Sequence, residues 1–308
     1  MAEKYRLVTR SDFDGLVCAV LFKELNLIDD IKFVHPKDMQ DGLIDIGPRD
    51  ISTNLPYVPG CHLAFDHHLS EALRNKHTVN YIIDPNAPSA ARVVYDYYGG
   101  ANRFPRVPYE MMVAVDKADS AQYDIEDILY PDGWVLLNYL MDARTGLGRF
   151  KQFRISNYQL MMALIDDCRR HSVEEILQLP DVRERVDVYR SHEEPAKSQI
   201  RRCSTVYDNL VVLDLREETT IYAANRFMIY ALLPMVNISI HVLWGVRQQN
   251  TVCAVGKSIL NRDSNTNVGA LCLSYGGGGH LAAGTCQVAN ADAERVLKEL
   301  IAKIIADG

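Results

Sequence analysis

The sequence predicts an α/β fold in two domains, the first built on a mostly parallel sheet and the second a smaller α/β domain with a mixed sheet. Strand and helix patterns alternate from residue 5 to residue 98, which is typical of βα units. The length of 308 residues exceeds what one hydrophobic core usually organises. A long charged helix pattern then precedes a second set of strands. We place the domains at 1–185 and 206–308, joined by a helical connector at 186–205.

The elements of the first domain follow from hydrophobic spacing and turn residues. A strand is expected at Tyr5–Thr9, and a helix follows the loop Arg10–Gly15, with leucines and valines at helical spacing. Further strands are expected at Ile31–Val34, within Asp41–Pro59, at His62–Phe65 and at Val79–Ile83. Proline and serine before residue 90 and two glycines after residue 98 bound the next helix.

The remaining elements are helical first and mixed later. Helices are expected at Met111–Ala118, Trp134–Met141, Tyr158–Cys168 and, as the charged connector, Asp181–Ile200. Strands are expected at Leu210–Leu213, Ile238–Val246, Val252–Val255 and Thr285–Val288, with helices at Asn225–Leu233 and Asn290–Ile305. A glycine loop is expected at Gly276–Gly279.

The charge and cysteine content limit the classes of function. With 33 Lys+Arg, 40 Asp+Glu and a pI near 5.7, the chain lacks the basic surface that long duplex DNA requires. Seven cysteines without a C-x-x-C pair indicate reduced thiols. The amino-terminal residues show no apolar signal segment, and the apolar runs are too short to span a bilayer. We therefore expect a cytoplasmic protein without a membrane partner.

An acidic loop follows the first predicted strand. Asp12 and Asp14 are two residues apart and Gly15 relaxes the turn, so both carboxylates can point at one site. Ligands of open parallel sheets gather outside the carboxyl ends of the strands. The plainer alternative is a solvated turn with a helix N-cap, the commonest use of such aspartates.

Asp66, His67 and His68 also follow a strand directly. Carboxylate and neutral imidazole together suit a divalent transition metal such as Mn²⁺. The alternative is a surface loop with a hydrogen-bonded Asp-His pair. Asp50, Asp116 and Asp119 are further acidic candidates. Acids converging within about 4 Å would repel by roughly 4 kcal/mol per pair, so a shared edge would require cations.

A glycine run, Gly276–Gly279, precedes His280 near the carboxyl terminus. Glycines let the backbone approach an anion and direct N–H groups at it, and the histidine can donate to a phosphate or carboxylate oxygen. A flexible turn is the alternative. The residues therefore predict an anion-binding site whose contacts are Gly277, Gly278, Gly279 and His280.

The Asp66-His67-His68 triplet and the GGGGH run resemble the two signatures of the DHH phosphoesterases, the second being that of the associated DHHA1 domain. The resemblance spans nearly the whole chain, in the expected order. It is nearest to exopolyphosphatase-related proteins and to relatives of oligoribonucleases and phosphoadenosine-phosphate phosphatases. It implies an active site in the cleft between a DHH domain and a DHHA1 domain.

The resemblance also implies a site for two divalent cations, usually Mn²⁺, with Mg²⁺ or Co²⁺ as alternatives. Carried over position by position, the ligands are Asp12, Asp14, Asp50, His67 and Asp116, with Asp45 as the alternative to Asp50 and Asp119 as the alternative to Asp116. Asp66 and His68 are the expected catalytic pair, with Asp66 orienting His67 and His68 facing the phosphate.

One position departs from the family pattern. Many relatives have a histidine shortly before the first aspartate of the acidic loop, whereas Arg10 and Ser11 stand here. One metal would lose a nitrogen ligand, and Arg10 becomes a candidate substrate contact.

The function we predict is metal-dependent hydrolysis of a phosphodiester, phosphomonoester or phosphoanhydride. The substrate is expected to be a nucleotide, polyphosphate or short single-stranded oligonucleotide and not duplex DNA. The alternative is a non-enzymatic nucleotide-binding or sensing protein with a degenerate metal site. The sequence does not fix an oligomeric state, and a homodimer is left open.

Overall fold

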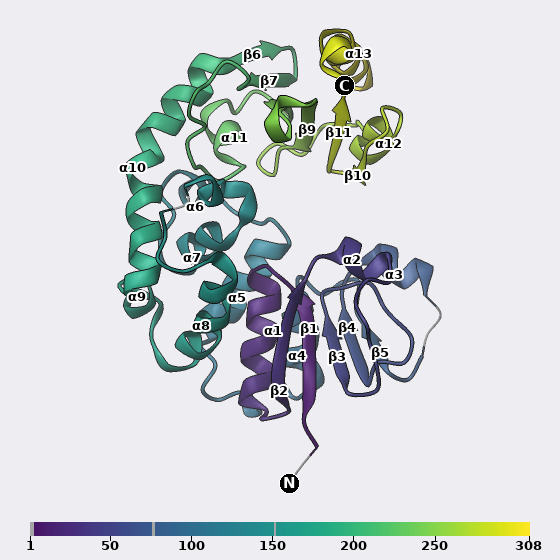
Figure 1. Cartoon of the computed structure of the whole chain (residues 1–308), viewed down its shortest axis with the longest axis vertical. Helices are drawn as coiled ribbons and strands as arrows, with labels where there is room; N and C mark the ends of the chain where they lie inside the picture. The colour runs from purple at the N-terminus through teal and green to yellow at the C-terminus, as the bar shows by residue number, and fades with distance from the viewer. Residues whose placement is uncertain (1–2, 76–77, 151) are drawn as a thin grey trace. The chain divides into compact units, whose positions relative to one another are not determined.

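The computed structural model describes residues 3–75, 78–150 and 152–308. Its contacts divide the chain into two compact units. The N-terminal unit comprises residues 1–122, 131–143 and 147–187, and the C-terminal unit comprises residues 123–130, 144–146 and 188–308. The division falls inside the long helix α10 (Pro180–Cys203), drawn in green in Figure 1. Two short segments before α10, residues 123–130 and 144–146, belong with the C-terminal unit.

The N-terminal unit contains a five-stranded sheet in which all neighbouring strands are parallel, as predicted. The strand order is β2-β1-β3-β4-β5, and Figure 1 shows the strands side by side. The strands are β1 (Tyr5–Arg10), β2 (Ile28–Val34), β3 (Asp50–Thr53), β4 (Leu63–Asp66) and β5 (Tyr81–Ile83).

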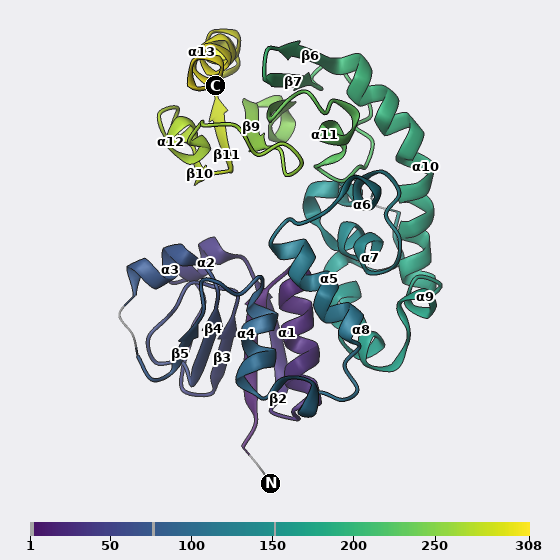
Figure 2. The same ribbon diagram turned by 180° about the vertical axis from the view of Figure 1, so that it is seen from behind.

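Helix α1 (Phe13–Glu24) is the centre of the N-terminal core. Its residues from Phe13 to Phe22 are all buried, and it contacts α4, α5 and α8. Figure 2 shows α1 and α4 in front of the strands. The other helices of this unit are α2 (Pro36–Gln40), α3 (Leu69–Arg74), α4 (Ala90–Tyr97), α5 (Tyr109–Asp119), α7 (Gly133–Met141), α8 (Asn157–Arg170) and α9 (Val173–Ile176), with 3-10 turns η1 (Gly100–Asn102) and η3 (Leu147–Arg149).

The strand order decides which loops meet. Because all strands are parallel, the residues that follow β1, β3 and β4 lie at one edge of the sheet. Strand β2, the next in the chain after β1, lies on one side of β1, and β3 lies on the other side. The strand order therefore reverses its direction between β1 and β3. Such switch points are where open α/β sheets bind ligands. Asp12, Asn54 and His67 therefore lie at one edge.

The C-terminal unit has a six-stranded mixed sheet in the order β10-β11-β9-β8-β7-β6, with β7 and β8 as its parallel pair. Its strands are β6 (Ser204–Tyr207), β7 (Leu210–Asp214), β8 (Ile238–Trp244), β9 (Thr251–Lys257), β10 (Gly278–His280) and β11 (Ala283–Val288). Its helices are α6 (Ile125–Leu129), α11 (Met228–Leu232), α12 (Val268–Leu273) and α13 (Ala293–Asp307), with 3-10 turns η2 (Ala143–Thr145), η4 (Val246–Gln248) and η5 (Asn290–Asp292).

The glycine run differs most from its prediction. Gly278 and Gly279 belong to the edge strand β10, which pairs antiparallel with β11, and do not form a free loop. The seven cysteines are free thiols, all buried except the half-buried Cys203. No helix among the described residues combines the length and the apolar composition needed to cross a membrane.

Candidate metal centre

Asp14, His67 and Asp119 form the cluster of ligating side chains in the N-terminal unit. Each offers one ligand atom, and these atoms all lie within 4.8 Å of one another. Asp14 comes from the first turn of α1, His67 follows β4, and Asp119 is the last residue of α5. Three segments far apart in the sequence therefore contribute to one point at the carboxyl edge of the sheet.

Asp14 is fixed by the start of a second helix. Its Oδ1 accepts a hydrogen bond from the Ala91 amide at 2.7 Å and its Oδ2 one from the Ala90 amide at 3.0 Å. The partial positive charge at the amino terminus of α4 favours the carboxylate there. Burial nevertheless raises the pKa of Asp14 well above its usual value, and the nearby Asp119 and Asp12 carboxylates raise it further. A bound cation would relieve this penalty.

The ring of His67 is oriented so that Nε2 points at the other two side chains of the cluster. Nδ1 lies 3.1 Å from the Ala87 carbonyl oxygen, which can only accept, so Nδ1 carries a proton. Nε2 faces Oδ2 of Asp119 at 2.8 Å. Burial opposes protonation, but Asp119 and Asp14 outweigh it and raise the pKa of His67 to about 9.

The donor set fits a divalent cation. Two carboxylate groups and an imidazole nitrogen are ligands that Mn²⁺ and related ions accept. The 2.8 Å approach of Nε2 to the Asp119 oxygen needs a positive charge between the two atoms, which the Nε2 proton supplies in the free protein and a bound cation would supply in its place. The Ala87 carbonyl holds the ring from the other side, as partners of metal-bound histidines commonly do.

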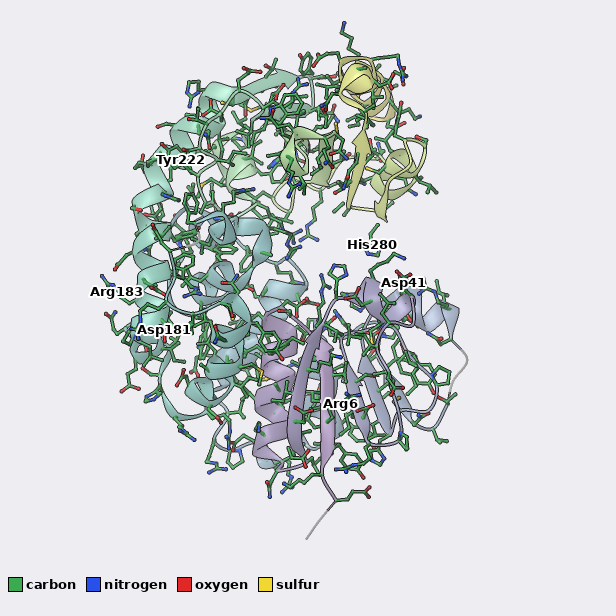
Figure 3. The ribbon with its side chains drawn as sticks, viewed as in Figure 1. Arg6, Asp41, Asp181, Arg183, Tyr222 and His280 are labelled. Carbon is green, nitrogen blue, oxygen red and sulfur yellow. The ribbon has the colours of Figure 1, made fainter. Side chains whose placement is uncertain are left out.

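Asp50, predicted as a ligand, lies elsewhere. It is the first residue of β3 and pairs in register with Arg6, whereas the carboxyl end of β3 is Thr53. Three residues of strand separate the two ends by about 10 Å. Arg6 binds both carboxylate oxygens, at 2.7 and 2.9 Å, and Figure 3 shows Arg6 towards the end of the sheet away from α2. The exposed alternative Asp45 likewise does not belong to the cluster: its backbone oxygen accepts from Arg6.

Asp116, the other predicted ligand, is replaced in the cluster by its alternative. Arg92 donates to Oδ2 of Asp116 at 2.5 Å from Nη2 and at 2.9 Å from Nε, and the Ser89 hydroxyl donates to Oδ1 at 2.7 Å. Asp116 thus ties α5 to the start of α4. Asp119, one turn later at the helix end, reaches His67.

This exchange makes a testable prediction. Asp119→Asn is expected to weaken Mn²⁺ binding by about 10- to 100-fold or more, because it removes one of the three candidate ligands of the cluster. Asp116→Asn is expected to keep Mn²⁺ affinity within about twofold and to lower the melting temperature, because a half-buried ion pair with Arg92 is lost. Calorimetric Mn²⁺ titration and thermal melting measure both. The reverse ranking of the two affinities would restore Asp116 as the ligand.

Asp12 lies beside the cluster and serves as the N-cap of α1. Its Oδ1 accepts from the Gly15 amide at 3.0 Å. Its Oδ2 lies 2.9 Å from Nε of Arg10, and the Asn54 side-chain amide lies 3.3 and 3.4 Å from its two oxygens. Gly15 is required here because a Cβ at that position would lie 1.9 Å from the Arg10 carbonyl oxygen.

Asn54 was not predicted from the sequence. It follows the carboxyl end of β3, is almost completely buried, and adopts a left-handed backbone conformation with φ of 54°. Asparagine tolerates this conformation better than most residues. An asparagine directly after a strand, before Leu55 and Pro56, was the available signal.

Asp66 orients His68 and not His67. Asp66 is fully buried, and its Oδ1 accepts from Nδ1 of His68 at 2.7 Å and from the His67 amide at 2.8 Å. The Tyr81 hydroxyl donates to its other oxygen at 3.3 Å. The predicted Asp66–His67 pairing is therefore corrected, because the Ala87 carbonyl takes that role. With Nδ1 held by Asp66, the half-exposed His68 ring presents Nε2 on its far side.

In the C-terminal unit, Gly277 and Gly279 lie so close to the backbone of β11 that neither position has room for a side chain. A Cβ on Gly277 would lie 2.1 Å from the Thr285 carbonyl oxygen, and one on Gly279 would lie 2.3 Å from that of Ala283. A groove of about 400 Å³ lies along the segment, and the exposed His280, labelled in Figure 3, contributes to it. The other lining residues include Asn267, Gly269, Ala270, Leu273, Gly278, Gly279 and Leu281.

Solved structures identify relatives of this chain, although no protein-family model and no curated protein matches it. The pGpG-specific phosphodiesterase PggH from Vibrio cholerae is 65% identical, with a TM-score of 0.90, over 99% of this chain and 100% of that one. CDC45 from Entamoeba histolytica, 9% identical with a TM-score of 0.53 over 98% and 95% of the two chains, shares the fold.

The similarity to PggH extends over both units. At 65% identity, the two chains belong to one family. It agrees with the Asp66-His67-His68 triplet after β4 and with the glycine-histidine run in β10. The chain belongs to the DHH phosphoesterase family, hydrolases that act on phosphate esters.

Proposed function

We propose that this protein is a divalent-cation-dependent phosphodiesterase that hydrolyses the dinucleotide pGpG. The observation that carries the proposal is the 65% identity, over 99% of the chain, to a phosphodiesterase specific for pGpG. The net charge of −7 agrees with a small substrate that a local positive site can bind. The non-enzymatic alternative is not favoured, because this relative is itself an enzyme.

Asp14, His67 and Asp119 are the proposed ligands, and Mn²⁺ is the proposed ion because two carboxylates and one imidazole suit it. When bound, a divalent cation supplies Lewis-acid stabilisation of charge on the phosphate and activates water for attack. The chain positions the ligands through the Ala90 and Ala91 amides and the Ala87 carbonyl oxygen. The family resemblance implies two cations, whereas this cluster holds the ligands of one.

His68 is the proposed residue that faces the reacting phosphate and exchanges a proton there through Nε2. Asp66 accepts from Nδ1, which fixes the ring and leaves Nε2 for the substrate. In the reaction, the oxygen of water bonds to phosphorus, the bond between phosphorus and the leaving ribose oxygen breaks, and that oxygen takes up a proton. Hydrolysis of the internal diester of pGpG then yields two molecules of GMP.

The Gly277–Gly279 segment and His280 are the proposed contacts for another part of the dinucleotide. Their backbone can approach an anion closely because the glycines carry no side chain. Binding and orientation of this kind contribute much of the catalysis of phosphoryl transfer.

The proposal is tested by measuring GMP release from pGpG with purified protein. Hydrolysis is expected with Mn²⁺, is expected to stop with a chelator, and should return when Mn²⁺ is restored. Other linear dinucleotides, phosphoadenosine phosphate, short oligonucleotides and polyphosphate form the comparison panel. The assignment is refuted if the wild-type protein cleaves pGpG no faster than the Asp14→Asn variant does. It is also refuted if the wild-type protein cleaves another member of the panel faster than pGpG.

A further inference from the structure

We infer that each chain binds one divalent cation, at Asp14, His67 and Asp119, and that the Arg10 guanidinium takes the place of a second. This inference rests on the proposed function only for the identity of the phosphate that Arg10 would contact. The number of bound cations can be measured without any substrate.

Five side chains are expected as metal ligands, and three of them, all carboxylates, are bound to an arginine. Arg6 binds Asp50, Arg10 binds Asp12 and Arg92 binds Asp116, with closest nitrogen–oxygen distances of 2.7, 2.9 and 2.5 Å. The two that remain, Asp14 and His67, cluster with Asp119. The described residues therefore assemble the ligands of one cation, and the positive charge beside the remaining acids is supplied by the chain.

The surroundings of Asp12 do not suit a second cation. Its carboxylate is contacted by a guanidinium, by the amide nitrogen of Asn54 and by the Gly15 amide, all of them hydrogen-bond donors. The donor face of Asn54 must point at Asp12, because the opposite orientation would set the amide oxygen against a carboxylate. A guanidinium cannot be deprotonated in proteins, so it repels a dication near Asp12 at every accessible pH.

Arg10 is also placed to contact a phosphate. It is the last residue of β1, at the carboxyl edge of the sheet, and its side chain is 37% exposed. The planar guanidinium matches the geometry of two phosphate oxygens. It is also weakly hydrated, whereas a second metal ion would have to lose bound water before it could contact the phosphate. Asp12, held by the Gly15 amide, fixes the direction of the Arg10 side chain.

The experiment is a titration of metal-free protein with Mn²⁺, followed by calorimetry and by electron paramagnetic resonance of the free ion. The wild-type protein is expected to bind one equivalent per chain. The double variant Arg10→His/Asn54→Asp replaces the guanidinium by an imidazole and the amide by a carboxylate, and it is expected to bind two. Arg6→His is the matched control, since Arg6 lies on the same strand at its opposite end, and it should still bind one.

Three outcomes would overturn the inference. The first is that the wild-type protein binds two equivalents of Mn²⁺, or none. The second is that the double variant binds only one equivalent although its melting curve shows that it is folded. The third is that Arg6→His binds a second equivalent. The assay with pGpG separates this result from the proposed function. One equivalent without pGpG hydrolysis refutes the substrate and leaves the inference standing, whereas two equivalents with pGpG hydrolysis refute the inference alone.

Discussion

Asp14→Asn is expected to lower kcat for phosphodiester hydrolysis by about 10³-fold or more, because a bound cation contributes several kcal/mol of charge stabilisation. The substitution keeps the shape of the buried side chain, and its one amide oxygen can accept from one of the two backbone amides, Ala90 or Ala91, that bind Asp14. It removes the charge that binds the cation. Calorimetric titration should show loss of the Mn²⁺ equivalent together with the loss of activity.

Thermal melting provides a second readout for this variant. A ligand at 100 times its Kd stabilises a protein by about 2.7 kcal/mol, so Mn²⁺ should raise the melting temperature of the wild type and not that of Asp14→Asn. Asp50→Asn is the matched control, because Asp50 is also a buried aspartate of this unit but is bound by Arg6. It should retain the Mn²⁺-induced shift. Equal losses in both variants would contradict the assignment of the metal to Asp14.

Gly279→Ala is expected to lower kcat/KM for pGpG by about 10²-fold, while Mn²⁺ binding stays unchanged. A Cβ at this position would lie 2.3 Å from the Ala283 carbonyl oxygen and 2.4 Å from the Gly284 Cα, so β10 must shift away from β11. A displacement of about 1 Å in a positioning group can cost a factor of 10². Steady-state kinetics with pGpG measures the effect.

Gly278→Ala is the matched control for this prediction. Gly278 neighbours Gly279 on the same strand, and no atom lies within 4 Å of where its Cβ would be. Its kcat/KM should remain within about threefold of the wild type. If both variants lost activity equally, or if neither did, the close packing of Gly279 against β11 would not be what makes the segment functional.

The parallel sheet could be predicted because its signals are local. Alternation of apolar strands with amphipathic helices determines βα units, and the loop after each strand can be read directly. These signals suffice to place Asp14 and His67 at the carboxyl edge of the sheet. The short strands β6 and β10 were not predicted, because their pairing depends on the neighbouring strands β7 and β11.

The choice between acidic residues could not be made from sequence. Asp116 and Asp119 lie one turn apart on α5, so helical spacing places them on similar faces. The structure separates them because Arg92 and Ser89 of the α4 region reach Asp116. The family resemblance implies Asp50 as a ligand, yet Asp50 is the first residue of β3 and so lies at the opposite edge of the sheet from the cluster.

The pairing within the histidine motif shows the same limit. The family resemblance implies that Asp66 orients His67, but the Asp66 carboxylate accepts from the ring of His68. His67 turns instead towards the Ala87 carbonyl, which lies 20 residues further along the chain. Asn54 likewise became a candidate only when the end of β3 was seen beside Asp12.

The sequence by itself determined the fold class, the family motifs and the edge of the sheet where the chemistry lies, because these depend on local periodicity and on which residues follow each strand. Only the tertiary structure decided which acids cluster with His67 and which bind an arginine. That choice depends on contacts between residues distant in the chain, such as Arg6 with Asp50 and Arg92 with Asp116, whose distances no local pattern fixes.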